Sequence, residues 1–191
     1  MVAMGGAAHA RTVVLVEGVS DQVAVEALAA RRGRNLEAEG ISVVPIGGAQ
    51  AIGTFLVRFG PQGFDVRLAG LCDAGEEDDF RRGLERAGLG SNLSRADMER
   101  LGFYVCVADL EDELIRSLGA AAVEQVIDSQ GDLQSFRTLQ KQPAWRGRST
   151  EEQLRRWFGS YGGKIKYARP LVDALDLTRV PRPLDRVLAH V

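Results

Sequence analysis

The sequence is poor in the residues that build zinc sites, disulfide frameworks and membrane spans. It holds two cysteines and two histidines in 191 residues, and no Cys/His cluster has the spacing of a zinc site. No apolar run approaches the roughly 20 residues of a membrane helix, and the opening MVAMGGAAHA lacks the pattern of a signal peptide. These absences argue against a membrane protein and predict a cytoplasmic chain in which Cys72 and Cys106 are buried free thiols.

The net charge of −2 does not by itself suggest a nucleic-acid-binding protein, but the charges are unevenly distributed. Residues 1–136 contain 12 Lys and Arg against 21 Asp and Glu, whereas residues 137–191 contain 12 against 5. A basic C-terminal third is typical of chains that bind a polyanion. The alternative is that these charges are dispersed and cancel across the folded surface.

Short apolar runs alternate with amphipathic runs in the first half of the chain. The apolar runs are rich in β-branched residues and too short for helices, which predicts strands. We expect strands over 12–16, 41–46, 66–73 and 103–109, with helices over 20–33, 49–60 and 76–88 between them. This order predicts right-handed βαβ units and an α/β fold with a mostly parallel, four-stranded sheet flanked by helices.

The pattern is helical from about residue 111 onward. The expected helices cover 111–119, 121–131, 133–142, 150–160, 164–175 and 183–191. We therefore predict a flexible N-terminus over 1–11, an α/β core over 12–110, and a helical extension over 111–191 that completes the same domain.

Acidic residues follow three of the four predicted strands. Glu17 follows the first, Asp73 ends the third, and Asp109 ends the fourth, with Glu111 two residues later. Ligands of an open parallel sheet bind outside the carboxyl ends of its strands, and Asp21 lies in the first turn of the helix after Glu17. Hard oxygen ligands without His or Cys predict one or two Mg²⁺ or Mn²⁺ ions. Helix capping is the competing explanation for Asp21, but it accounts poorly for Glu17, which precedes the cap.

These motifs resemble a known family. VVLVEGVSD (13–21), VVPIGG (43–48) and LCDAGEE (71–77) resemble, in order and spacing, the TOPRIM domain of topoisomerases, bacterial primases and some nucleases. The version of the first motif with an added acid four residues after the Glu, here Asp21, is similar to that of the TOPRIM domain of OLD (overcoming lysogenization defect) nucleases. ADLEDELI (108–115) resembles the second acidic site of that subgroup, and KIKYA (164–168) resembles its Lys-x-x-x-Ala helix start.

The resemblance implies a metal-dependent DNA nuclease, acting as an endonuclease or nickase by a two-metal mechanism. Glu17 and Lys164 would be catalytic, with Lys164 supplying positive charge to the transition state and Lys166 as its fallback. The ligands of the first ion would be Glu17, Asp21 and Asp73, and those of the second Glu111 with Asp109 or Glu113.

Three features depart from the family pattern. Asp109 stands where OLD nucleases often carry Ser or Thr, two residues before the second-site Glu. The third motif reads Asp73-Ala74-Gly75, so the second acid of the expected DxD is missing, and Glu76 or Glu77 is its candidate replacement. OLD proteins also carry an ABC-type ATPase, whereas no GxxxxGK[ST] motif occurs here. We therefore expect any ATPase to be a separate subunit; the oligomeric state stays open.

Basic and aromatic residues are interleaved in the C-terminal third. The candidates for phosphate contacts are Arg146, Arg148, Arg155, Arg156, Lys166 and Arg169. Trp145, Trp157 and Tyr161 could stack on bases, although the helical spacing of Trp157 from Leu154 favours a place in the core.

Three other functions stay open. The chain could be a weakly active or inactive TOPRIM module that binds metal or nucleic acid and acts with a separate ATPase or DNA-processing partner. Primer synthesis or strand passage would require a zinc domain or a nucleophilic tyrosine domain, for which the chain has little room. A phosphatase that uses an aspartate nucleophile would carry Asp where this chain has Glu17.

Overall fold

The computed structural model describes residues 10–160 and 163–191. At its centre lies a four-stranded sheet in which all strands run parallel, in the order β2-β1-β3-β4. The strands are β1 (Thr12–Val16), β2 (Ile41–Pro45), β3 (Arg67–Asp73) and β4 (Phe103–Cys106). The predicted α/β fold with a parallel sheet is therefore confirmed.

Helices connect and cover these strands. In the first half they are α1 (Val19–Arg31), η2 (Ala49–Ala51), α2 (Ile52–Phe59), η3 (Ala74–Glu76), α3 (Glu77–Arg86) and α4 (Arg95–Arg100). In the second half they are α5 (Leu110–Leu118), α6 (Ala120–Ser129), α7 (Leu133–Lys141), α8 (Thr150–Phe158), α9 (Gly163–Ala174) and α10 (Arg182–His190). All six helices expected after residue 111 are present.

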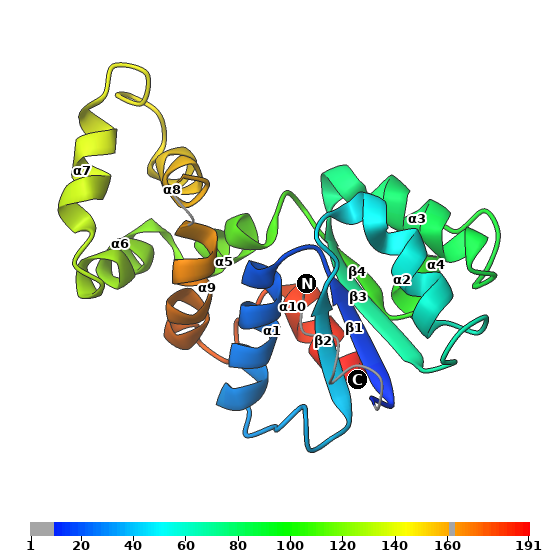
Figure 1. Cartoon of the computed structure of the whole chain (residues 1–191). Coiled ribbons are helices and arrows are strands. Elements are labelled where there is room, and N and C mark those ends of the chain that lie inside the picture. The colour runs from blue at the N-terminus through cyan, green and yellow to red at the C-terminus, as the bar shows by residue number, and fades with distance from the viewer. Residues whose placement is uncertain (1–9, 161–162) are drawn as a thin grey trace.

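The sheet is covered on both faces (Figure 1). Helices α2, α3 and α4 lie on one face, α1 and α10 lie on the other, and α9 packs beside α1. Along β1, Val13 and Leu15 belong to the core beneath α2, α3 and α4. Val14 and Val16 belong to the core beneath α1 and α10. A strand covered on both sides is apolar on both of its faces, which explains the continuous apolar run at 13–16.

One prediction about local structure was wrong, and one helix was missed. The fourth strand ends at Cys106, which lies opposite Asp73 in β3, so Asp109 is not a strand residue. It is instead the N-cap of α5, where its Oδ1 accepts a hydrogen bond of 2.8 Å from the amide of Asp112. Helix α4 was not expected, although Ser94 and Asp97 form the capping box that could have revealed it.

The predicted boundary between an α/β core and a helical extension at residue 110 stays a prediction. The core on the α1 side of the sheet contains residues of β1 together with residues of α5 to α10. Cys72 and Cys106 are both buried and free, as expected. No helix within residues 10–160 and 163–191 has the length and apolar content needed to cross a bilayer.

Arginines at the end of α1 hold the two last helices. The Nη1 atom of Arg31 donates hydrogen bonds of 2.7 Å to the carbonyl oxygens of both Val172 and Leu175, at the end of α9. Arg34 donates in the same way to the carbonyl oxygen of Leu188 in α10, at 2.6 Å. Carbonyl groups in the last turn of a helix lack their regular partners within it. The arginines therefore give these carbonyl groups charged donors, although that of Val172 also accepts from the amide of Leu175, at 3.1 Å.

We expect Arg31→Ala to lower the free energy of unfolding by about 1.5–3 kcal/mol, because hydrogen bonds to a charged group contribute that much. Arg32→Ala is the matched control, since the neighbouring Arg32 makes an ion pair of 2.5 Å with the partly exposed Asp185. Such pairs contribute about 0–1 kcal/mol. Urea unfolding measures both variants, and equal losses would refute the capping role of Arg31.

Candidate metal centre

Glu17 links the ends of three strands. Its Oε1 accepts a hydrogen bond of 2.7 Å from the amide of Asp73, at the end of β3. Its carbonyl oxygen accepts hydrogen bonds from the amides of Gly47 and Gly48, just after β2, at 3.1 and 3.2 Å. Both glycines have positive φ angles, 78° and 115°, which L-residues with a side chain rarely adopt. The turn at Gly47 and Gly48, which follows β2, is thus the element that fixes the backbone of Glu17.

Asp21 has a local structural role as well as a place near Glu17. One carboxylate oxygen, Oδ2, accepts a hydrogen bond of 2.8 Å from the amide of Gly18 and so caps α1. Burial, followed by repulsion from Glu111 and Glu17, raises the pKa of Asp21 to about 6. One oxygen atom of Asp21 therefore has the capping role. The negative charge of the carboxylate also repels the neighbouring acids.

Asp73 is the most perturbed acid of the group. Burial raises its pKa to about 8, with further contributions from the negative charges of Glu17, Asp21 and Asp109. The pKa of Glu17 is raised too, first by burial and then by repulsion from Glu76 and other acids. Acids that raise one another's pKa lie close together, as expected of carboxylates that a cation would neutralise.

Lys164 places a positive charge beside this group. At the start of α9, its Nζ lies 2.8 Å from Glu111 Oε2 and 3.6 Å from Asp109 Oδ2. Burial would lower the pKa of this ammonium, but Glu111, Asp109 and Asp73 together raise it above its usual value. Lys164 also lowers the pKa values of the carboxyl groups of Asp21 and Asp73. The ammonium is therefore a counter-ion shared by several acids.

Two predicted site residues have other partners. Glu113 accepts a hydrogen bond of 2.8 Å from the amide of Val107 and pairs with Arg116 at 2.8 Å. Lys166 forms an ion pair with Asp132, at the start of α7. The structure thus brings Asp109, rather than Glu113, beside Glu111 and Lys164, and it leaves Lys166 bound to a residue outside the group.

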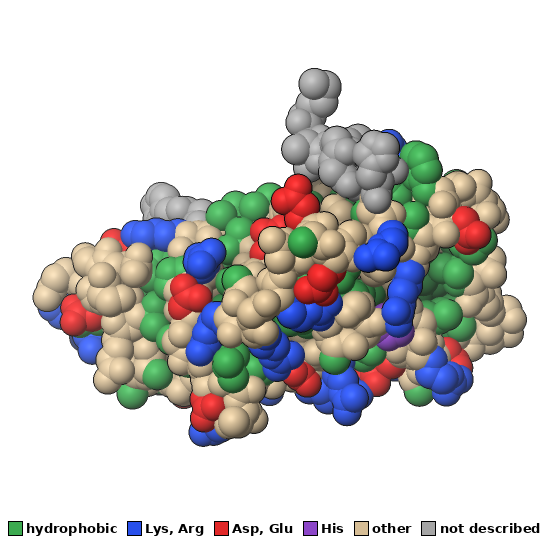
Figure 2. Space-filling model, turned by 90° about the horizontal axis from the view of Figure 1, so that it is seen from below, with side chains coloured by type: hydrophobic (Ala, Val, Ile, Leu, Met, Phe, Trp, Pro, Cys, Tyr) green, Lys and Arg blue, Asp and Glu red, His purple; other side chains and the backbone are tan. Residues whose placement is uncertain are grey.

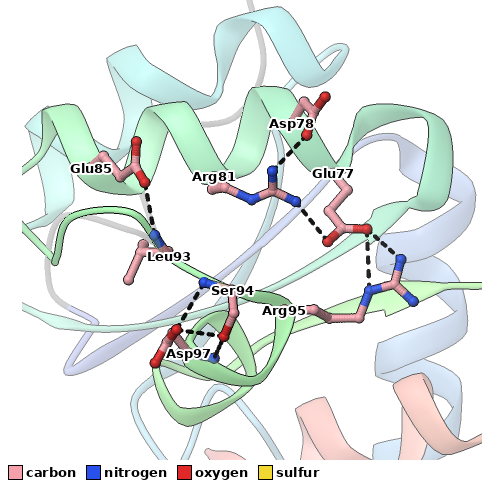
Figure 3. A network of polar contacts seen from close by, with 8 residues as sticks. All are labelled: Glu77, Asp78, Arg81, Glu85, Leu93, Ser94, Arg95 and Asp97. Atoms are coloured by element: carbon pink, nitrogen blue, oxygen red, sulfur yellow. Dashed lines mark hydrogen bonds and ion pairs between the residues drawn. The ribbon is translucent and has the colours of Figure 1, made fainter.

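The two candidates for the missing DxD acid differ in their contacts. Glu77 is held by Arg81, at 3.0 Å, and by Arg95 (Figure 3). These arginines lower the pKa of Glu77. The charge of Glu76, by contrast, raises the pKa of Glu17. Glu76 is therefore the acid that lies near the strand ends, whereas Glu77 belongs to a separate network with α4.

The donor set fits a divalent cation in its chemistry. It consists of carboxylates, and their negative charges raise the pKa values of Glu17, Asp21 and Asp73. Hard oxygen ligands are those that Mg²⁺ and Mn²⁺ prefer. In the described part of the chain, however, no group of three or more Asp, Glu, His or Cys side chains is arranged so that it could hold an ion as it stands. Binding would therefore require side-chain rotations that bring the acids together and release Lys164 from Glu111.

The predicted phosphate-binding residues fall into two sets. Four have acidic partners, namely Arg148 with Glu152, Arg155 with Asp112, Lys166 with Asp132 and Arg169 with Asp173. The other two, Arg146 and Arg156, have none among the described residues. Tyr161 lies outside the described residues. On the face in Figure 2, basic and acidic side chains are interspersed, so on that face the charges are dispersed.

A cavity apart from the acidic group was not predicted from the sequence. It is a cavity of about 430 Å³ lined by residues of α4, β4, α5 and the start of α10, including Arg95, Arg116 and Arg182. Each of these arginines is paired with a carboxylate: Arg95 with Glu77, Arg116 with Glu113 and Arg182 with Glu99. Its residues are distant in sequence, so no local pattern could reveal it.

The pKa of Asp73 predicts how stability depends on pH without divalent ions. An unfolded Asp has a pKa of about 3.9, so the folded state binds more protons between about pH 4 and pH 8. The free energy of unfolding then falls as pH rises through this window. We expect Asp73→Asn, measured by thermal unfolding in EDTA, to be more stable than the parent at pH 8 and to have a flatter pH profile.

Asp128→Asn is the matched control for Asp73→Asn, because Asp128 is an exposed acid of α6. It should leave the pH profile of the parent unchanged. A parent chain whose stability does not fall between pH 4 and pH 8 would contradict the raised pKa of Asp73.

Comparison with known proteins finds a family model that matches the first part of the chain. The family model "Overcoming lysogenization defect protein-like, TOPRIM domain" matches residues 9–74, the segment that contains Glu17, Asp21 and Asp73. A search of curated proteins finds no match. TOPRIM domains of this type are associated with metal binding and nucleic-acid processing.

Solved structures extend the similarity to most of the chain. The C-terminal region of the Xanthomonas campestris pv. campestris OLD protein has a TM-score of 0.76 at 24% identity, over 98% of this chain and 94% of that chain. The C-terminal region of the Burkholderia pseudomallei OLD protein has a TM-score of 0.74 at 20% identity, over 95% and 96%. Residues 9–74 thus match an OLD-like TOPRIM domain, and the chain has the fold of the C-terminal region of OLD proteins.

Proposed function

We propose that this chain is a metal-dependent nuclease that hydrolyses phosphodiester bonds of DNA with one or two Mg²⁺ or Mn²⁺ ions. The observation that carries the proposal is the group of acids around Lys164, in which Asp73 has a pKa of about 8. Burial and mutual repulsion make the charged form of these carboxyl groups unfavourable, and a bound cation stabilises that form. The site also lies where ligands of parallel sheets bind, outside the carboxyl ends of the strands.

Each residue has a distinct task in this proposal. Glu17, Asp21 and Asp73 would hold one ion, and Glu111 with Asp109 would hold the second. Bound divalent ions activate water as a nucleophile and neutralise charge on the leaving oxygen. Lys164, released from Glu111, would place its ammonium beside the phosphate, where negative charge develops in the transition state.

A second function is favoured by one specific departure. The sequence Asp73-Ala74-Gly75 lacks the second acid of the DxD motif, and no described group of acids is arranged to hold an ion as it stands. The chain would then be a weakly active module that binds metal or nucleic acid and depends on a separate ATPase or DNA-processing partner. A nuclease assay of the purified chain with Mg²⁺, Mn²⁺ or Ca²⁺, with and without ATP, separates the two functions.

We expect Glu17→Gln to reduce plasmid nicking in Mn²⁺ buffer by roughly 10²–10⁴-fold, the size of effect typical of an essential acid or base. The amide keeps an oxygen that can accept from the amide of Asp73, so the fold should be retained. Glu113→Gln is the matched control, because Glu113 is bound to Val107 and Arg116. Nicking by Glu17→Gln at the parent rate, or equal losses in both variants, would overturn the assignment.

Glu76 should contribute to metal binding, whereas Glu77 should not. We expect Glu76→Gln to weaken the rise in melting temperature that Mn²⁺ produces in the parent, because ligand binding stabilises the folded state by mass action. Glu77→Gln should lower the melting temperature without metal, since it breaks the ion pairs with Arg81 and Arg95, but should leave the Mn²⁺ response unchanged. The reverse pattern would assign the role to Glu77.

A further inference from the structure

The connection between α7 and α8 is a turn at the end of the molecule that lies away from α2, α3 and α4 (Figure 1). The amides of Trp145 and Arg146 both donate to the carbonyl oxygen of Gln142, each at 2.9 Å. Arg148 in turn donates its amide to the carbonyl oxygen of Trp145, at 3.1 Å. This connection carries a tryptophan and two arginines within four residues.

A buried glutamine holds this turn from within. Gln153 of α8 is 6% exposed, and its Nε2 donates to the carbonyl oxygens of Trp145, at 2.9 Å, and Arg148, at 3.3 Å. Its Oε1 accepts a hydrogen bond of 2.7 Å from Gln140 of α7. A buried amide is costly unless its hydrogen bonds are made. The turn therefore has a specified conformation, although its side chains are largely at the surface.

The charges around this turn are unbalanced. Residues 141–156 include five Lys and Arg and two Glu. Arg148 and Arg155 have carboxylate partners, Glu152 and Asp112. No ion pair joins Lys141, Arg146 or Arg156 to any carboxylate of residues 10–160 and 163–191; Arg146 donates to the carbonyl oxygen of Lys141, at 3.3 Å.

The two tryptophans have different surroundings. Trp157 packs against Phe136, Phe158 and Tyr167, with ring centroids 5.1–6.0 Å apart, and so belongs to the core as expected. Trp145 is partly exposed and packs with neither core; its ring lies 6.0 Å from the guanidinium carbon of Arg156. Arginine over an indole ring leaves a flat, polarisable surface that an unstacked base can extend.

We propose that Trp145, Lys141, Arg146 and Arg156 form a grip for single-stranded nucleic acid. A base stacks on Trp145, and phosphates contact the three cations that lack acidic partners. A duplex hides the faces of its bases, so the tryptophan favours a single strand. The inference rests on the proposed action on DNA and adds the strandedness of the substrate, with a contact surface formed by residues other than the predicted metal ligands.

The test measures binding without cleavage. A fluorescein-labelled oligothymidylate of about 15 nucleotides, within the span of known single-strand sites, is titrated with the full chain in EDTA and followed by anisotropy. We expect Trp145→Leu to weaken binding by roughly 5- to 150-fold, the range for loss of one stacked base. Trp145→Phe retains an aromatic ring and should keep most of the affinity, which controls for folding.

Arg146 and Arg148 provide a matched pair on the same turn. Arg146→Ala should weaken binding and reduce the slope of log affinity against log salt by about 0.7, the value for one phosphate contact on a single strand. Arg148→Ala should change both quantities less, since Arg148 is already paired with Glu152. Equal effects of the two substitutions, or no effect of Trp145→Leu, would overturn the grip.

Other outcomes identify other partners or test the nuclease separately. Tighter binding of a duplex of equal length would overturn the preference for a single strand. Displacement of the oligonucleotide by polyglutamate at the same charge concentration would show a non-specific polyanion surface and overturn base stacking.

Two variants separate the grip from the nuclease. Glu17→Gln should bind the oligonucleotide as the parent does, so loss of nicking with retained binding would leave the grip intact. Parent-like nicking by Trp145→Leu without binding would leave the nuclease intact.

Discussion

The arrangement of the candidate site depends on the hydrogen bonds made by Glu17. Its side chain accepts from the end of β3, and its carbonyl group accepts from the turn after β2. One residue thus joins the ends of three neighbouring strands, and both of its acceptor groups are used. The position of Asp73 follows from this link, because its own amide is the donor. Hydrogen bonds within the protein therefore fix the backbone at this edge of the sheet without a cation.

The acids at this edge are held at a cost to the stability of the apoprotein. Burial and mutual repulsion raise the pKa values of Glu17, Asp21 and Asp73 together. Lys164 offsets part of this repulsion from α9, a helix that comes almost 150 residues after Glu17 in the chain. Carboxylates retained under such repulsion are typical of functional sites, since replacement by amides would relieve it. The same feature that lowers stability makes the group ready to accept positive charge.

Much of the fold could be predicted because strand signals in a doubly covered sheet are local. The run at 13–16 is apolar at every position, and the structure has a strand with the predicted bounds, 12–16. The end of the fourth strand could not be read from Val107 and Asp109, because it depends on where β3 stops. The partners of Glu113 and Lys166 were also beyond local patterns: a backbone amide for the first, and for the second an aspartate from α7. Sequence spacing predicts the helix or strand on which a site residue lies. It does not predict which other residue will bind that side chain.

The clamp between Arg31 and the end of α9 has a consequence for the distant end of both helices. Helices α1 and α9 lie side by side and run in the same direction, with Asp21 and Lys164 near their first turns (Figure 1). From Asp21 to Arg31 the helix rises roughly 15 Å. Because each helix is close to a rigid rod, fixing their last turns also fixes how far one can slide along the other. The separation of Asp21 and Lys164 at the candidate site is thus set about three helical turns away.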